Sequence, residues 1–378
     1  QDYCSFDLGN KLYRLDSNKF SLLLDTLPEH NFAENLALEL RQSLAHSICI
    51  EGKQFHLTLS IGISHHPLQG AEGETLLANA DAALTRIKTD GGDGILCYSQ
   101  DIQDKEQAWI NIERDLRTAI EKQQLELFYQ PKIQSLEHGI CGVEALIRWR
   151  KDDGKMISPF EFIPVAEQTG LIITIGDWVI EQAFKQLKDW QKLFIKQGDL
   201  QLLETFSVAV NLSAKQFQHP DFITNIKKHL LKAEIEAPFI ELEITESLLI
   251  NDIEESIRIM HELKNIGFKL SIDDFGTGYS SLSYLKQFPI DKLKIDRAFV
   301  MDIERNDDDK VLAKSIIDLA HNLRLGVIAE GVENQQQLTI IETLGAEEIQ
   351  GFYFSKPKPN IEIEAEYFIK PDTIITDS

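Results

Sequence analysis

The pattern of apolar and polar positions divides the chain into a short α+β region and a long region of alternating strands and helices. Residues 30–48 have helical apolar spacing, residues 54–64 alternate as a strand does, and residues 73–92 form a helical pattern that stops at glycines. A short strand pattern follows at residues 97–100. These elements amount to half a domain, so we expect the chain to begin inside an α+β domain that covers residues 1–100.

A second segment, residues 101–124, is charged and amphipathic and contains few breakers, which predicts one helix. A continuous helix is stiff enough to carry an orientation from one domain to the next. We therefore expect a linker helix here.

Strand-like and helical runs alternate regularly over residues 125–365, and residues 366–378 remain as a C-terminal tail. The strand-like runs are residues 125–133, 143–149, 206–213, 239–247, 268–276, 291–299, 325–333 and 347–355. About eight strands with helices between most of them predict a (β/α)-barrel. An open doubly wound sheet is the alternative, although no strand is followed by a dinucleotide-binding fingerprint.

Charge limits the partners of this protein. The 378 residues carry a formal net charge of -23, with a pI near 4.8. Such an acidic chain is not expected to hold a nucleic-acid polymer on a basic surface. A phosphate-bearing substrate would have to be met by recruited cations.

Cysteine usage and hydropathy bear on the compartment. The four cysteines are too scattered for a disulfide framework or a paired zinc motif, so we expect free thiols in a reducing cytoplasm. No apolar run approaches the roughly 18 residues that a membrane span needs. The chain begins with Gln1 rather than Met, which predicts a fragment or a processed form. We expect a cytoplasmic location, or the cytoplasmic part of a membrane-anchored protein with an upstream sensor.

Polar side chains recur near the carboxyl ends of the predicted strands, which meet at one face of a parallel barrel. They are Glu144, Asn211, Glu243, Glu246, Asp273, Asp274, Lys294, Asp296, Glu330, Glu333 and Gln350. Carboxylates that converge there repel one another, and divalent cations relieve this. Because the donors are oxygens without histidine or cysteine, Mg²⁺ or Mn²⁺ is favoured over Zn²⁺. Two such ions about 3.5–4 Å apart activate a water and stabilise the leaving oxygen of a phosphoester.

Lys294 and Asp296 are two residues apart on a predicted strand and therefore share a face. A lysine among acids can position the attacking water or neutralise developing charge. A simple ion pair is the alternative.

The stretch "SIDDFGTGYSS", residues 271–281, is open to three interpretations: a phosphate-binding glycine loop, a calcium loop, or a metal site with a flexible turn. No lysine follows until Lys286, and a closing glutamate is missing, which disfavours the first two. We expect a two-metal site at the strand end, followed by a turn that Gly276 and Gly278 permit.

Eight motifs in order, "YQP", "EALIRW", "NLS", "ELEITES", "DDFGTGYSSL", "LKID", "AEGVE" and "QGFYFSKP", resemble the EAL-domain family of bacterial cyclic di-GMP phosphodiesterases over roughly Arg114 to Pro359. The resemblance implies a modified TIM (β/α)8 barrel that hydrolyses cyclic di-GMP to linear pGpG. It implies a site for two Mg²⁺ or Mn²⁺ ions formed by Glu144, Asn211, Glu243, Asp273, Asp274 and, through water, Glu330.

The resemblance also implies roles for other residues. Lys294 would hold the nucleophilic water, Glu330 would belong to the catalytic set, and Glu246 would hold the loop after Asp274. Contacts to the dinucleotide are implied for Gln130, Leu146, Arg148, Asp296, Glu333 and Gln350. No position that the family's chemistry needs departs from its pattern. Family members often pair through elements beside the "DDF" loop, so a homodimer through the barrel is expected.

The first hundred residues resemble the C-terminal half of a degenerate GGDEF domain, the diguanylate cyclase fold. Its signature loop falls at "RLDSNKF", where Asp16 and Ser17 replace the two glycines and Asn18 and Lys19 replace the two acids. Cyclase activity is not expected, and we expect this domain and the linker helix to regulate the barrel. The feedback motif "RxxD" is also absent, because Asp7 and Asn10 stand in its place.

A second sequence, "GGDG" at residues 91–94, is predicted to be a helix C-cap rather than the signature loop. His65 and His66 are predicted to have no third metal ligand nearby.

Two alternatives to the phosphodiesterase stay open. One is a receptor that binds cyclic di-GMP without turnover and signals through its linker helix. The other is a metal-independent barrel hydrolase such as a glycosidase, against which Lys294 and Asn211 argue.

Overall fold

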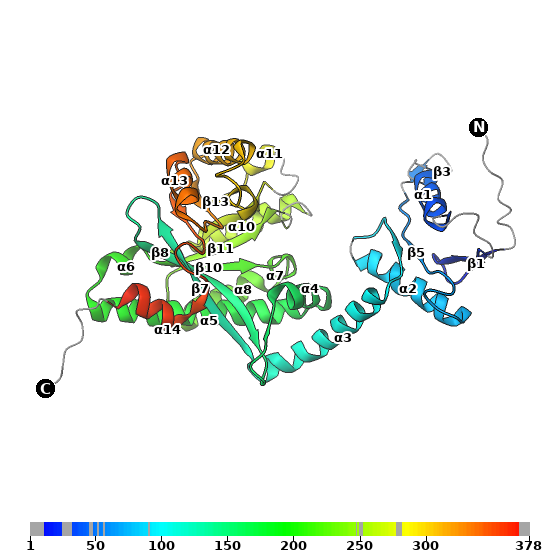
Figure 1. The fold of residues 1–378 in the computed structure, drawn as a ribbon. Helices are drawn as coiled ribbons and strands as arrows, with labels where there is room; N and C mark the ends of the chain where they lie inside the picture. The colour runs from blue at the N-terminus through cyan, green and yellow to red at the C-terminus, as the bar shows by residue number, and fades with distance from the viewer. Residues whose placement is uncertain are drawn as a thin grey trace. The chain divides into compact units, whose positions relative to one another are not determined.

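The computed structural model describes residues 11–24, 32–44, 48–50, 53–55, 57–89, 91–246, 248, 252–276 and 282–369 (Figure 1). Its contacts divide the chain into two compact units, Gln1–Asn111 and Ile112–Ser378. Helix α3 (Gln100–Glu121) lies where the linker helix is predicted. No helix in the described part of the chain is long and apolar enough to cross a membrane.

The described residues of the first unit form three pairs of short strands and two helices, and α3 begins in this unit. The antiparallel pairs are β1 (Leu12–Arg14) with β2 (Phe20–Leu22) and β3 (Ile48–Ile50) with β4 (Lys53–Phe55), the parallel pair is β5 (Ile61–Ile63) with β6 (Ile95–Cys97), and the helices are α1 (Phe32–Leu44) and α2 (Gly73–Thr89). The single strand predicted at residues 54–64 is therefore wrong, since residues 57–60 separate β4 from β5. Among the described residues the buried core here is small and centres on Ala83 and Tyr98.

Two local predictions for this unit can be compared with the structure. The amide of Gly92 donates to the carbonyl of Ile87 at 2.8 Å, and Gly91 and Gly92 both have positive φ, which confirms that "GGDG" follows a helix end. The degenerate signature loop connects β1 to β2, and Lys19 forms an ion pair with Asp81 of α2. The cation at position 19 is thus engaged by an acid of its own unit.

The second unit is a closed barrel of eight strands. In spatial order these are β7 (Leu125–Gln134), β15 (Glu348–Ile349), β14 (Gly326–Ala329), β13 (Lys292–Ile295), β12 (Lys269–Phe275), β11 (Ile240–Thr245), β10 (Ser207–Leu212) and β8 (Ile140–Arg150), which pairs back with β7. Strand β7 runs antiparallel to both neighbours, whereas the other pairings around the barrel are parallel. The predicted modified TIM barrel is confirmed. Short strands β9 (Met156–Ile157) and β16 (Lys358–Pro359) pair with β8 and β7.

Helices cover the outside of the barrel. They are α4 (Pro159–Thr169), α5 (Leu171–Gln197), α6 (Leu200–Thr205), α7 (Ala214–Phe217), α8 (Phe222–Ala233), α10 (Ile253–Ile266), α11 (Leu282–Leu285), α12 (Asp307–Asn322), α13 (Gln335–Leu344) and α14 (Asn360–Ile363), with the shorter helical turns η1 (Ala237–Phe239), η2 (Arg297–Phe299) and η3 (Glu364–Phe368). Helix α5 packs along β7, β8 and β10 (Figure 1). Its Trp190 and Phe194 meet Phe206 and Phe368 edge to face, with ring centroids 4.9–5.6 Å apart. These aromatic contacts hold the longest helix against the barrel.

The barrel interior contains a lower layer of buried charges. Lys132 donates to Glu241 at 3.0 Å, Lys292 donates to the other oxygen of Glu241 at 2.9 Å, and Lys292 lies 2.7 Å from Glu348. Burial alone would raise the pKa of Glu241, but the two ammonium groups hold that pKa well below its usual range. Two lysines and two glutamates make the layer neutral, so it needs no added ion.

The lower layer can be tested by removing one cation. We expect Lys132→Met to lower the free energy of unfolding of the barrel by about 3–5 kcal/mol, because it leaves a fully buried Glu241 short of a partner. Urea unfolding followed by fluorescence of the buried Trp149 and Trp190 measures this loss. The matched control Lys192→Met removes an exposed ion pair with Asp189 and should leave the transition unchanged. Equal stability of Lys132→Met and the parent chain would contradict the role of the layer.

Candidate active site

The structure brings most of the predicted site residues together at one end of the barrel. Glu144 lies in β8, Asn211 in β10, Glu243 in β11, Asp273 and Asp274 in β12 and Lys294 in β13, while Glu330 and Gln350 directly follow β14 and β15. Glu144 lies in the middle of its strand rather than at its end, because the β7–β8 ladder continues from Glu144 to Trp149. The site therefore faces the middle of this extended ladder.

Lys294 is the centre of an upper layer of charges. Its Nζ lies 2.7 Å from Glu243, 3.1 Å from Asp273 and 2.6 Å from Glu330, and the side chain is 1% exposed. Burial acts to lower the pKa of Lys294, but the surrounding carboxylates, including Glu144, raise it well above its ordinary value. Lys294 is therefore a fixed cation in this layer. Glu243 connects the two layers, since its other oxygen accepts from Lys132 at 2.7 Å.

Amide side chains hold Glu144. Asn211 donates to one carboxylate oxygen at 2.6 Å and Gln350 donates to the other at 2.5 Å. Gln350 also donates to Gln130 at 3.1 Å. A Cβ on Gly351 would lie 2.0 Å from the carbonyl oxygen of Val332, so only glycine fits directly after Gln350. Strand β15 ends at Ile349, well short of the strand predicted at residues 347–355.

Asp273 and Asp274 lie at a distortion of β12. The register between β12 and β13 shifts between Ile272 and Phe275, and Asp274 has a φ of 54°. Adjacent side chains of a regular strand point to opposite faces, and such a bulge re-aims them. Burial first, then the charges of Asp273 and Asp296, raise the pKa of Asp274 to about 6. The local backbone thus places one carboxylate near two others.

The upper layer has more negative charge than Lys294 can balance. Glu144, Glu243, Asp273, Asp274 and Glu330 supply five carboxylates, which together with Lys294 leave a net charge of −4 when all are ionised. Burial and the charges of the neighbouring acids raise the pKa of Glu330, although Lys294 acts in the opposite direction. Two divalent cations would neutralise this excess.

The donor set fits hard cations, because it consists of carboxylate oxygens and the Asn211 amide. In the described residues the carboxylates of the barrel do not gather within 4.8 Å of one another as the ligand atoms of one cluster in the first unit do. These carboxylates contact Lys294 and the amides of Asn211 and Gln350 instead. Their role as metal ligands stays a prediction.

Glu246 contacts the start of the loop after Asp274. The amide of Gly276 donates to Oε2 of Glu246 at 3.3 Å, and Oε1 of Glu246 is buried without a hydrogen-bond partner in the described part of the chain. Gly276 has a φ of 97°, which only glycine adopts readily. Residues 277–281, including the predicted turn residue Gly278, lie outside the described residues. The proposed control of this loop by Glu246 stays a prediction.

A cleft of about 200 Å³ opens beside the upper layer. It is lined by Gln130, Glu144, Leu146, Asp273, Arg297, Glu330, Gly331, Glu333, Gln350, Gly351 and Phe352. Two predicted substrate contacts lie outside this lining. Asp296 accepts from the amide of Ala298 at 2.8 Å and so caps η2, while the Arg148 guanidinium stacks over Phe128 at 5.5 Å. Gln130, Leu146, Glu333 and Gln350 are at the cleft as predicted.

Several residues of the site were not predicted from the sequence. Arg297 is the one cationic side chain in the described lining of the cleft, and it pairs with Glu333 at 2.8 Å. Its position directly after "LKID" could have indicated it. Lys132 and Glu241 were also missed, although charges that recur every second residue within apolar strands, as in "ELEIT" and "KLKI", are a visible indication of a charged inner face.

Comparison with protein families gives two matches. The EAL domain matches residues 113–357, and the diguanylate cyclase GGDEF domain matches residues 4–94. The first match alone covers more than half of the chain.

Curated relatives match both regions together. The bifunctional diguanylate cyclase/cyclic di-GMP phosphodiesterase MucR of Pseudomonas aeruginosa is 37% identical over 346 residues, which cover 92% of this chain and 49% of MucR. The signaling protein YkoW of Bacillus subtilis is 40% identical and covers 93% of this chain and 43% of YkoW. The cyclic di-GMP phosphodiesterase NbdA of P. aeruginosa is 36% identical, with coverage of 93% and 44%. The chain thus spans about half the length of these relatives or less.

Solved structures are similar over the barrel. The PaMucR phosphodiesterase in complex with c-di-GMP is 40% identical, with a TM-score of 0.63, and covers 67% of this chain and 99% of that one. The EAL enzyme Bd1971 in its cAMP- and cyclic-di-GMP-bound form is 36% identical, with a TM-score of 0.66 and coverage of 76% and 74%.

The charge excess predicts how pH affects cation binding. We expect Mn²⁺ affinity to fall as pH drops from 7.5 to 5.5, by up to about tenfold per pH unit for each proton displaced. Affinity falls at low pH because Asp274, with a pKa of about 6, is protonated below that pH. The carboxyl group must lose this proton before it can bind a cation. Calorimetry in buffers of different ionisation enthalpy measures both the affinity and the released protons. A pH-independent affinity across this range would contradict the described electrostatics.

Proposed function

The chain belongs to the EAL-domain family, and on this premise we propose that it hydrolyses cyclic di-GMP to linear pGpG with two divalent cations. It is homologous to cyclic di-GMP phosphodiesterases. The observation that carries the proposal is the upper layer of five carboxylates around Lys294, which borders the cleft and has a charge excess that matches two divalent cations.

We assign the cation ligands residue by residue. Glu144, Asn211, Glu243 and Asp273 would hold the first cation, and Asp273, Asp274 and, through water, Glu330 would hold the second. When bound, Mg²⁺ or Mn²⁺ activates a water for attack on the phosphoester and stabilises the leaving oxygen.

Lys294 positions the nucleophilic water in this proposal. Its ammonium group now donates to Glu243, Asp273 and Glu330. If cations shared those carboxylates, Lys294 could donate a hydrogen bond to the water. Because its pKa is raised, Lys294 stays protonated and acts as a donor rather than as a base. Glu330, whose pKa is also raised, can hold a proton at the same place.

The cleft supplies the contacts to the dinucleotide. Gln130, Leu146, Glu333 and Gln350 line it, and we add Arg297 as the donor to a phosphate oxygen, since a guanidinium can bind phosphate in a bidentate manner. Arg148 stacks over Phe128 and Asp296 caps η2, so both side chains would have to turn toward the cleft to contact the substrate.

Regulation by the first unit and by a homodimer is a further part of the proposal. The degenerate signature loop supports it, because Asp16 and Ser17 replace the glycines and Lys19 is paired with Asp81. Such a loop cannot cradle a nucleotide closely. We therefore assign the first unit and α3 a regulatory role, with dimer contacts beside the "DDF" loop, in a cytoplasmic protein or cytoplasmic part of one.

Turnover tests the proposal. Incubation of the chain with cyclic di-GMP and Mn²⁺ should give pGpG, and chelator should abolish it. Asp273→Asn should lower kcat by at least about 100-fold, because the loss of a cation removes several kcal/mol of charge stabilisation. The matched control Asp318→Asn changes an exposed acid on α12 and should keep full activity.

Two other results would contradict the proposal. Tight nucleotide binding without pGpG at saturating Mn²⁺ would identify a receptor. Product formation that chelator does not affect would identify a metal-independent hydrolase.

A further inference from the structure

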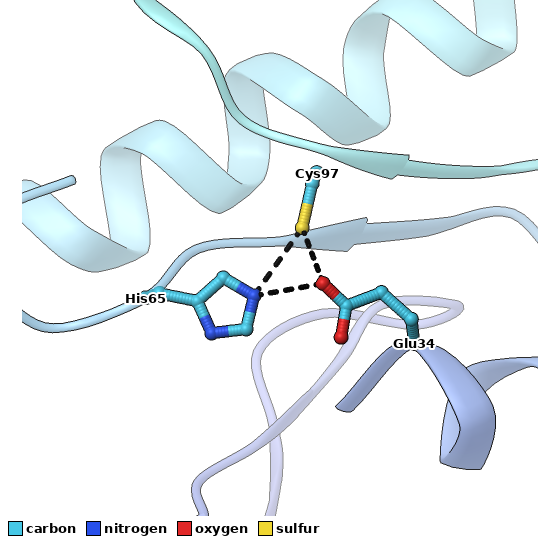
Figure 2. Close-up of side chains that lie close together, drawn as sticks. All are labelled: Glu34, His65 and Cys97. Carbon is cyan, nitrogen blue, oxygen red and sulfur yellow. Dashed lines mark hydrogen bonds and ion pairs between the residues drawn. The ribbon is translucent and has the colours of Figure 1, made fainter. Parts of the chain in front are cut away.

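Three side chains of metal-ligand type converge in the first unit (Figure 2). Glu34 lies in the first turn of α1, His65 follows β5, and Cys97 is the last residue of β6. Nε2 of His65 lies 3.1 Å from Oε1 of Glu34, Sγ of Cys97 lies 3.2 Å from the same oxygen, and Sγ and Nε2 are 3.3 Å apart. The prediction that His65 has no third ligand nearby is therefore wrong.

The strand pairing holds two of these residues in place. Cys97 pairs with Ile63 in the parallel β5–β6 ladder, and the amide of Tyr98 donates to the carbonyl of Ile63 at 2.7 Å. Gln69 connects the segment after β5 to the end of β6. Its Oε1 accepts from the amide of His65 at 2.8 Å, and its Nε2 donates to the carbonyl of Tyr98 at 2.5 Å. The positions of His65 and Cys97 are thus fixed by backbone contacts and by one side-chain amide.

The spacing of the three ligand atoms matches a tetrahedral cation. Zinc bonds of about 2.0–2.3 Å to nitrogen, oxygen and sulfur place neighbouring ligands about 3.3–3.6 Å apart. The observed triangle of 3.1–3.3 Å needs only a small expansion to accept such an ion. A thiolate and a carboxylate would neutralise a divalent cation, and a neutral imidazole completes three ligands. A thiol with an imidazole favours Zn²⁺ over Mg²⁺ or Mn²⁺.

A second observation indicates that hydrogen bonds alone do not satisfy this cluster. The Glu34 side chain is 36% exposed, but its Oε2 atom is shielded from solvent and has no hydrogen-bond partner in the described part of the chain. Buried carboxylate oxygens rarely stay unpaired, so an oxygen left over beside a thiol and an imidazole fits a carboxylate that a cation would share.

We propose that Glu34, His65 and Cys97 form a Zn²⁺ site that is separate from the cations of the barrel in both position and ligand type. Three protein ligands leave the fourth tetrahedral position for water. The ion would join α1, β6 and the segment after β5. Because the described buried core of this unit is small, such a connection would add a substantial part of its stability.

Cobalt absorption tests the site directly, because Co²⁺ substitutes for Zn²⁺ and shows a near-ultraviolet charge-transfer band when a thiolate binds it. The full chain, reduced and freed of metal, should develop this band and tetrahedral visible bands with one equivalent of Co²⁺, and Zn²⁺ should remove them. The predicted ligands of the barrel include no thiol, so cations bound there give no such band. One equivalent of Zn²⁺, but not Mg²⁺, should also raise the unfolding temperature of the first unit.

Matched variants separate the three ligands from their neighbours. Cys97→Ser should abolish the charge-transfer band, and His65→Gln and Glu34→Gln should weaken Co²⁺ binding at least 100-fold. Gln69→Ala should weaken it about 10–100-fold, as expected when a group that orients a ligand is lost. His66→Gln and Cys141→Ser, which lie outside the cluster, should keep the band.

The proposal fails if the parent chain shows no charge-transfer band with one equivalent of Co²⁺, or if the band persists in Cys97→Ser. If Cys97→Ser does not fold, the Co²⁺ affinity of Glu34→Gln tests the proposal instead. This variant keeps the size and hydrogen-bonding capacity of the side chain. Parent-like Co²⁺ affinity in a folded Glu34→Gln chain would equally overturn the three-ligand site. Turnover of cyclic di-GMP is not the readout, so failure here is distinct from failure of the proposed phosphodiesterase.

Discussion

Repulsion between carboxylates inside one barrel is the constraint on which the arrangement of this protein depends. Two layers of charge follow from it. In the lower layer Lys132 and Lys292 balance Glu241 and Glu348, and the result is a neutral floor. In the upper layer Lys294 is the central cation among five carboxylates, of which only Glu243 also contacts Lys132, and most of the negative charge stays unbalanced. In our proposal the lower layer stabilises the barrel, whereas the upper layer would bind cations and, through them, the phosphates of the substrate.

Much of the barrel could be predicted from sequence, because alternation of apolar strands and amphipathic helices is a local property. The acids of the site could be predicted as well, since parallel strands bring their carboxyl ends together. The antiparallel direction of β7 could not be predicted from sequence, because the direction of a strand depends on how the barrel closes. The positive φ of Asp274 could not be predicted either, because it occurs at a register shift between β12 and β13. Arg297 and Lys132 were missed for a related reason, since their partners lie on other strands and loops.

The first unit shows the same limit more clearly. Its degenerate signature loop is visible in the sequence, and substitution of glycines and acids suffices to predict that it is inactive as a cyclase. The cluster of Glu34, His65 and Cys97 has no such local pattern. Glu34 lies 31 positions before His65 in the sequence, and Cys97 lies 32 positions after it. Parallel pairing of β5 with β6 and the packing of α1 bring them together. The two units would therefore bind cations of different classes, hard ions on oxygen and a softer ion on sulfur and nitrogen.

Anomalous diffraction from crystals of the chain grown with Mn²⁺ and a non-hydrolysable cyclic di-GMP analogue tests the central claim most directly, because it counts and locates the cations at the upper layer. We expect two manganese peaks there, both within bonding distance of Asp273, with the nucleotide phosphate in the adjoining cleft. A single peak that leaves Asp274 and Glu330 without a cation, or nucleotide bound with no manganese among these acids, would contradict it.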